Sequence, residues 1–125
     1  GKGWKGVAVA AAFGFVGGGR LKAAKKIISI AYARRKAVQE AWALERQLII
    51  KTGKGTRRWS NKRKAEIIKT GRAKGFYGHH INSVSSRPDL AGNPDNIRFV
   101  TFREHFALHS FNWRNKTKGK LIKRR

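Results

Sequence analysis

The sequence predicts a small α+β domain in which a long basic helix and a short helix precede two short strands and a further helix. Three observations carry this prediction. Apolar residues recur at helical spacing through 20–50, β-prone runs occupy 76–81 and 97–100, and a helix-capping sequence begins at Thr101. With 125 residues, the chain is long enough for one domain with a modest core.

The net charge of the chain is strongly positive. It carries 30 Lys and Arg against 6 Asp and Glu, a formal net charge of +24. A hydrophobic share of 40% is too high for a purely disordered tail, so part of the chain packs while much of its surface repels itself. A polyanion relieves that repulsion, which favours nucleic acid as the partner, then an acidic protein, and an anionic membrane third. Cysteine is absent, which excludes disulfides, Cys-ligated zinc and thiol nucleophiles.

Residues 1–19 are interpreted as a Gly/Ala-rich linker. The longest apolar run, 7–19, has 13 residues, whereas a membrane-spanning helix needs roughly 20. We therefore expect no stable membrane span, with a membrane-interacting segment used during delivery as the alternative. At the other end, the basic tail 112–125 is expected to fray.

The region 20–52 is expected to form one basic amphipathic helix, because its interior contains no Gly or Pro before Gly53. Its basic face is either a solvated surface or an extended contact for phosphates. A short helix is expected over 61–70, with Ser60 as its N-cap and Gly71 as its C-cap.

All four histidines of the chain, His79, His80, His105 and His109, lie within 31 consecutive residues. The capping box at 101–104 starts a helix that places the last two at i and i+4 on one face. Two imidazoles at that spacing can hold one divalent metal ion. Packing the strands against this helix would bring all four histidines together.

Four histidines divide into three ligands and one base. Cleavage of a phosphodiester needs a metal ion to neutralise the phosphate and a base to activate water on the opposite side. Three neutral imidazoles leave coordination positions open, and a fourth histidine that is not a ligand can take the proton. Nitrogen ligands favour Zn²⁺ or Ni²⁺, while Mg²⁺ or Mn²⁺ are alternatives in turnover.

The motif Gly78-His79-His80, followed by Asn96 and by a His-x-x-x-His pair, resembles the HNH, or ββα-metal, nucleases. More narrowly, YGHHI…NPDNIRFVTFREHFALH resembles the GHH-type nuclease toxin domains of bacterial polymorphic toxins and secretion-system effectors. We find the resemblance over about 59–111 and nothing usable before that. It implies a small, treble-clef-like nuclease core over 53–111.

The resemblance also implies roles for individual residues. His79, His105 and His109 would be the metal ligands, His80 the general base, and Asn96 the residue that holds the loop carrying the base. Further implications are secretion or delivery by a bacterial secretion system, action in the target-cell cytoplasm, DNA as the usual target, and a cognate acidic immunity protein.

Related nucleases often add an arginine that contacts the phosphate. Spacing does not separate the four basic candidates, which are Arg72, Lys74, Arg98 and Arg103. In an ideal strand, the two histidines of the GHH motif would point to opposite faces, so they share one site only if the backbone bends there. We expect Gly78 to supply that freedom.

Several other interpretations remain open. His80 could be a fourth ligand in a closed structural zinc site, and Asn96 could be only a turn residue. The aromatic residues are expected in the core, with base stacking by Tyr77 or Trp113 as the alternative. Beside a metal-dependent endonuclease of broad specificity, the runner-up function is a non-catalytic, basic nucleic-acid-binding protein. A cationic membrane-active protein is third.

Overall fold

The structure is a computed structural model that describes residues 18–125. The linker expected over 1–19 therefore lies, up to residue 17, outside the described residues. The helices and strands come in the order α2 (Gly18–Thr52), α3 (Asn61–Thr70), β1 (Tyr77–His80), η2 (Pro88–Leu90), η3 (Pro94–Asn96), β2 (Ile97–Val100) and α4 (Phe102–Leu108). None of the described helices is both long and apolar enough to cross a membrane.

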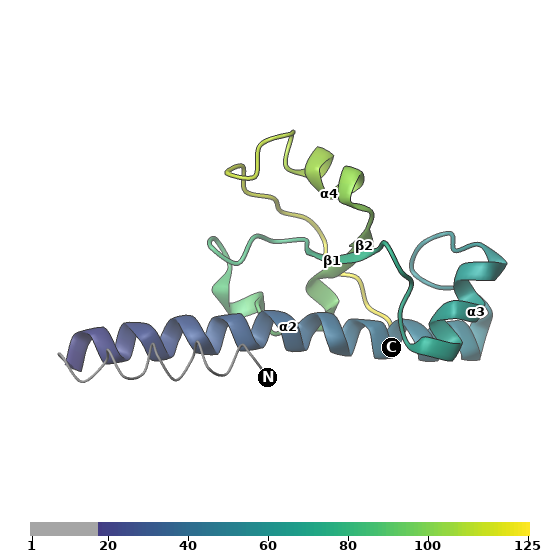
Figure 1. Cartoon of the computed structure of the whole chain (residues 1–125), viewed down its shortest axis with the longest axis horizontal. Helices are drawn as coiled ribbons and strands as arrows, with labels where there is room; N and C mark the ends of the chain where they lie inside the picture. The colour runs from purple at the N-terminus through teal and green to yellow at the C-terminus, as the bar shows by residue number, and fades with distance from the viewer. Residues whose placement is uncertain (1–17) are drawn as a thin grey trace.

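Helix α2 runs along the whole length of the domain, and the later elements lie along one side of it (Figure 1). Its 35 residues cover the stretch in which the apolar spacing predicts a helix. Buried side chains of α2 form part of the hydrophobic core, and Trp42 stacks on Phe99 of β2 with ring centroids 3.7 Å apart. The long helix and the sheet therefore share one core.

Helix α3 begins and ends at the caps that the sequence predicts. The Ser60 hydroxyl accepts a hydrogen bond from the Arg63 N–H, and Gly71 adopts a left-handed conformation from which its N–H donates to the Ile67 carbonyl. Ile67 is fully buried, so the helix is anchored to the core by one apolar residue.

Strands β1 and β2 form a two-stranded antiparallel sheet in which His79 lies opposite Arg98 and Gly78 opposite Phe99. Helix α4 follows directly, and its capping box is complete: Thr101 and Glu104 each bond the other's backbone N–H through their side chains. This small α+β arrangement agrees with the fold class that the sequence predicts.

The expectation that Gly78 supplies a bend is wrong. Among the described glycines, those with a positive φ are Gly53, Gly71 and Gly75, and β1 pairs regularly through Gly78. A Cβ at this position would lie 2.8 and 2.9 Å from the two Val38 methyl groups of α2. The glycine is needed because β1 passes too close to the helix to carry a side chain.

The expectation that the tail 112–125 frays is also wrong, because long-range hydrogen bonds hold it in place. The Thr117 N–H donates to the Ser83 hydroxyl at 2.7 Å, and the Ile122 N–H donates to the Asp95 carbonyl at 2.6 Å. The tail therefore closes over the loop between β1 and β2.

A buried ion pair joins this tail to α2. Arg124 donates from Nε to the Glu45 carboxylate at 2.8 Å, and both side chains are completely buried. Glu45 also accepts from Thr56 and from the Trp59 indole, while Arg124 donates to the carbonyls of Pro94 and Ile97. Both buried charges are thus paired and hydrogen-bonded, which offsets the free-energy cost of removing them from water.

Candidate metal centre

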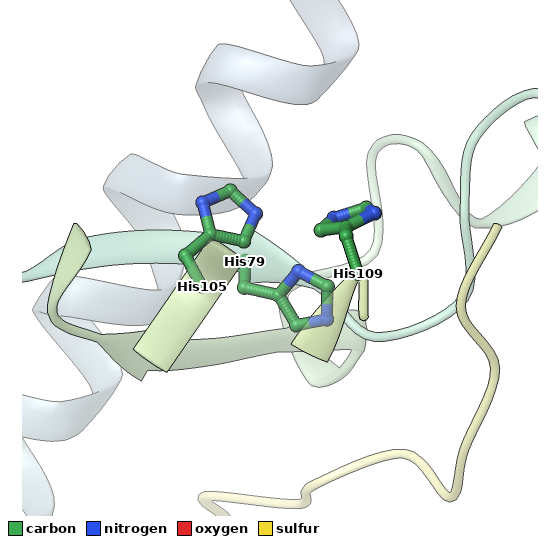
Figure 2. Close-up of side chains that lie close together, drawn as sticks. All are labelled: His79, His105 and His109. Atoms are coloured by element: carbon green, nitrogen blue, oxygen red, sulfur yellow. The ribbon is translucent and has the colours of Figure 1, made fainter. Parts of the chain in front are cut away.

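Three imidazoles from two elements meet beside the sheet. His79 comes from β1, and His105 and His109 come from consecutive turns at the end of α4, as the capping box predicts. One ring nitrogen of each lies within 4.8 Å of those of the other two. Figure 2 shows the three side chains gathered together, with ring centroids 4.8 to 5.5 Å apart.

Burial disfavours the protonated form of two of these imidazoles, His79 and His105. His79 is only 4% exposed, and this burial, reinforced by His105 and His109, lowers its pKa to about 4. Burial also lowers the pKa of His105, with His109 adding to the effect. Neutral imidazoles carry the lone pairs that a metal ion requires.

A hydrogen bond orients the third imidazole. The Nδ1 atom of His109 lies 2.7 Å from the Asn115 carbonyl, which can only accept, so Nδ1 carries the proton and Nε2 is left with its lone pair. The Asn115 side chain donates back to the His109 carbonyl at 2.9 Å. Such a partner behind a ligand is typical of metal-binding histidines. Three nitrogen donors arranged in this way fit one divalent ion of the zinc type. Asn115 was not predicted from the sequence, because no local pattern marks an asparagine in a basic tail.

His80 does not join this group. Its Nε2 donates to the Ala91 carbonyl at 3.0 Å, which leaves Nδ1 as an acceptor. The side chain lines a groove of about 520 Å³ with residues of α2, including Arg34 and Val38. Burial lowers the pKa of His80, against the opposing effect of the Ala91 bond and with help from Arg34. His80 in turn contributes electrostatically to the lowered pKa values of His79 and His105.

Asn96 ties the two sides of the loop together. It is completely buried, and its Oδ1 accepts from the backbone and the side chain of Asn82 at 2.9 and 3.0 Å. Its Nδ2 donates to the Asn82 carbonyl and to the Leu90 carbonyl. Leu90 immediately precedes the residue whose carbonyl holds His80. Asn82, also missed by the sequence analysis, closes this network by bonding Gly119 of the tail.

The four basic candidates lie in three different places. Arg98 lies across the sheet from His79, and both line a groove of about 500 Å³ with three lysines of the tail: Lys116, Lys118 and Lys120. Arg103 is exposed on α4. Arg72 and Lys74 follow α3 and line neither the His79 groove nor the His80 groove. The sequence did not mark the three lysines individually, because the tail reads as uniformly basic.

Comparison with known proteins gives one family match. The family model Tox-GHH, described as a GHH-signature-containing HNH/Endo VII superfamily nuclease toxin, matches residues 24–101. The match extends further toward the N-terminus than the motif resemblance, which offered nothing usable before residue 59. It takes in most of α2 and the two strands, and it ends before His105 and His109.

Similar regions occur in much larger animal proteins. Mouse teneurin-4 is 34% identical over 76 residues, which is 61% of this chain and 3% of the teneurin. Human teneurin-4 is 37% identical and Drosophila melanogaster teneurin-m 35% identical, each over 68 residues, or 54% of this chain and 2% of the relative. The chain thus spans only a few hundredths of the length of these relatives.

Proposed function

Because this chain belongs to the Tox-GHH family of HNH/Endo VII superfamily nuclease toxins, we propose that it is a metal-dependent endonuclease that hydrolyses phosphodiester bonds in DNA. The observation that carries the proposal is the group of three histidine ring nitrogens that lie within 4.8 Å of one another, one of them from His79 of the GHH motif. On this proposal, β1, β2 and α4 form the ββα-metal core of the nuclease.

His79, His105 and His109 would hold one divalent ion, which when bound would neutralise charge on the scissile phosphate and the leaving oxygen. The ligand type favours Zn²⁺ or Ni²⁺, with Mg²⁺ or Mn²⁺ as alternatives in turnover. The Asn115 carbonyl would keep the His109 ring in the ligating tautomer, as its 2.7 Å contact supports.

His80 would act as the general base. The Ala91 carbonyl fixes the proton on Nε2, so Nδ1 is free to accept a proton from the attacking water. Asn96 would act as a positioning residue, because its bonds to Asn82 and Leu90 fix both the strand end that carries His80 and the loop that orients it.

The groove beside His79 would bind the phosphate backbone. Arg98 and the three tail lysines supply four positive charges along it, and the net charge of +24 adds a sequence-independent attraction. Arg103 would extend this surface across α4. Binding through phosphates predicts broad sequence specificity and a steep dependence on salt.

Membership of a toxin family supports a role in delivery between cells, in which a bacterial secretion system brings the domain into the target-cell cytoplasm. A producing cell would then need an immunity protein. An acidic protein fits this role, because the positive field would attract it quickly to the basic groove.

Plasmid nicking with and without EDTA tests the proposal, alongside zinc titration by calorimetry. EDTA should abolish nicking. His80→Ala should lower the cleavage rate by about 10²- to 10⁴-fold and retain zinc, because the base is not a ligand. His109→Ala should lose both. The His80→Ala preparation also controls for contaminating nucleases. Loss of zinc from His80→Ala as severe as from His109→Ala would refute the assignment of the base, and DNA binding without any cleavage would favour the non-catalytic alternative.

A further inference from the structure

Helix α4 and the turn after it expose aromatic side chains that were expected in the core, so this expectation is wrong for Phe102, Phe111 and Trp113. No residue of α4 is buried, and the exposed fractions of Phe102, Phe111 and Trp113 are 64, 67 and 47%. With the partly buried Phe106, these rings form one continuous patch, which we name the aromatic platform. Contiguous exposed rings of this kind mark a binding surface more often than a packing surface.

The aromatic platform touches the candidate metal ligands directly. The Trp113 ring lies 4.9 Å from the His105 ring and 5.1 Å from the His109 ring, measured between centroids. The Trp113 ring also lies 5.0 Å from the Phe106 ring and 5.9 Å from the Phe102 ring, measured between centroids. A ligand lying on the platform would therefore border His105 and His109.

The turn between α4 and Trp113 has an uncommon backbone. Ser110 and Phe111 have φ values of 52° and 59°, a left-handed conformation that residues other than glycine rarely adopt. The turn folds the chain back so that Phe111 packs on Phe106, and Asn115 then bonds His109. These contacts fix the position of the platform although its rings are largely exposed to solvent.

Three basic residues lie close to these aromatic residues in the sequence. Arg103, Arg114 and Lys116 are exposed, and none forms an ion pair with a carboxylate in the described part of the chain. Aromatic faces interleaved with free cations are the features that bind single-stranded nucleic acid, in which bases stack on rings while phosphates meet the charges.

We propose that the aromatic platform stacks unpaired bases of the substrate next to the scissile phosphate, with Trp113 as the main stacking residue. The inference rests on the proposed nuclease function and narrows its substrate to nucleic acid with unpaired bases. In a regular duplex, the base faces are covered by neighbouring base pairs. Single-stranded or locally opened nucleic acid should therefore bind more tightly than an intact duplex.

The test measures binding in EDTA, so that cleavage does not enter. The full chain is titrated against a short fluorescent oligothymidine and an abasic oligonucleotide of equal length, with anisotropy as the readout. Trp113→Ala should weaken oligothymidine binding by roughly 5- to 150-fold and leave binding of the abasic strand unchanged. Trp113→Phe should restore most of the loss. Tyr32→Ala removes an equally exposed ring from α2 and should change neither affinity.

Phe102→Ala, at the exposed edge of the platform, gives the same comparison if Trp113→Ala fails to fold by circular dichroism. If the variant binds both oligonucleotides equally more weakly, or binds both as tightly as the unaltered chain, the stacking proposal is overturned while the nuclease proposal stands. In the second case, a protein partner would better explain the patch. Failure of the unaltered chain to bind either strand would overturn the stacking proposal, whereas the nuclease proposal is decided separately by plasmid nicking.

Discussion

Gly78→Ala tests the physical reason for the glycine in the GHH motif. The new methyl group would lie 2.8 and 2.9 Å from the Val38 methyls and 3.1 Å from Cγ2 of Ile97. Carbon atoms pack at about 3.5 to 4.0 Å, so the strand and helix must separate by several tenths of an ångström. Val38 cannot rotate away, because a β-branched side chain has one favoured rotamer in a helix. Such overpacking costs about 1 to 3 kcal/mol of unfolding free energy.

Urea unfolding in EDTA, followed by the fluorescence of the buried Trp42 and Trp59, measures this loss. Gly92→Ala is a matched control, because this loop glycine faces the same helix, α2, at Ala33. Its new Cβ would meet the Ala33 Cβ at 3.4 Å, an ordinary contact, so the substitution should leave stability unchanged or raise it slightly.

A double-mutant cycle completes the test. Val38→Ala removes the methyl groups that clash, so Gly78→Ala should cost much less in that background than alone, with a coupling energy of about 0.5 to 3 kcal/mol. The close-approach explanation would be refuted if the losses of unfolding free energy in the two single variants were additive in the double variant. It would also be refuted if the Gly78→Ala protein were as stable as the Gly92→Ala control. The glycine would then have a purely catalytic or backbone role.

Two further predictions concern buried charge. Arg124→Met leaves the Glu45 carboxylate buried without its cation, so the free energy of unfolding should fall by about 3 to 5 kcal/mol. Lys123→Met, at the exposed neighbouring residue, should have little effect. Equal stability of the two variants would contradict a stabilising role for the buried ion pair. Because burial holds the pKa of His79 near 4, the unfolded chain takes up a proton on acidification that the folded, metal-free chain does not. Stability in EDTA should therefore fall by about 2 kcal/mol between pH 7 and pH 5. A His79→Asn variant should lose most of this slope in urea titrations, and an unchanged slope would exclude His79 as its cause.

Local sequence signals predicted the parts of the site that depend on local geometry. The capping box at 101–104 placed His105 and His109 one turn apart, and the cap residues placed the ends of α3. Strand alternation indicates that the two neighbouring histidines point to opposite faces, yet we expected all four histidines to come together. That expectation is wrong for His80, which lies in a groove against α2 and outside the three-histidine group.

The parts that sequence did not predict depend on distant contacts. Gly78 has no unusual backbone, so its role is visible only when Val38 is placed against it. The tail has the composition of a disordered segment, and its order comes from partners such as Ser83 and Glu45 that lie 34 and 79 positions away. Nothing in the local pattern of charges identifies which of many arginines will be buried.

The contact between Glu45 and Arg124 also has a consequence for the time at which the domain can fold. Closing a chain segment of 79 residues costs about 4 kcal/mol of chain entropy by the logarithmic loop law. At roughly 5 to 20 residues per second, a ribosome reaches Arg124 about 4 to 16 s after it has added Glu45. Throughout that interval, the Glu45 carboxylate lacks its Arg124 partner, so the complete core cannot form. During this time, chaperones or a binding partner can bind the nascent chain before the histidines are fixed in place.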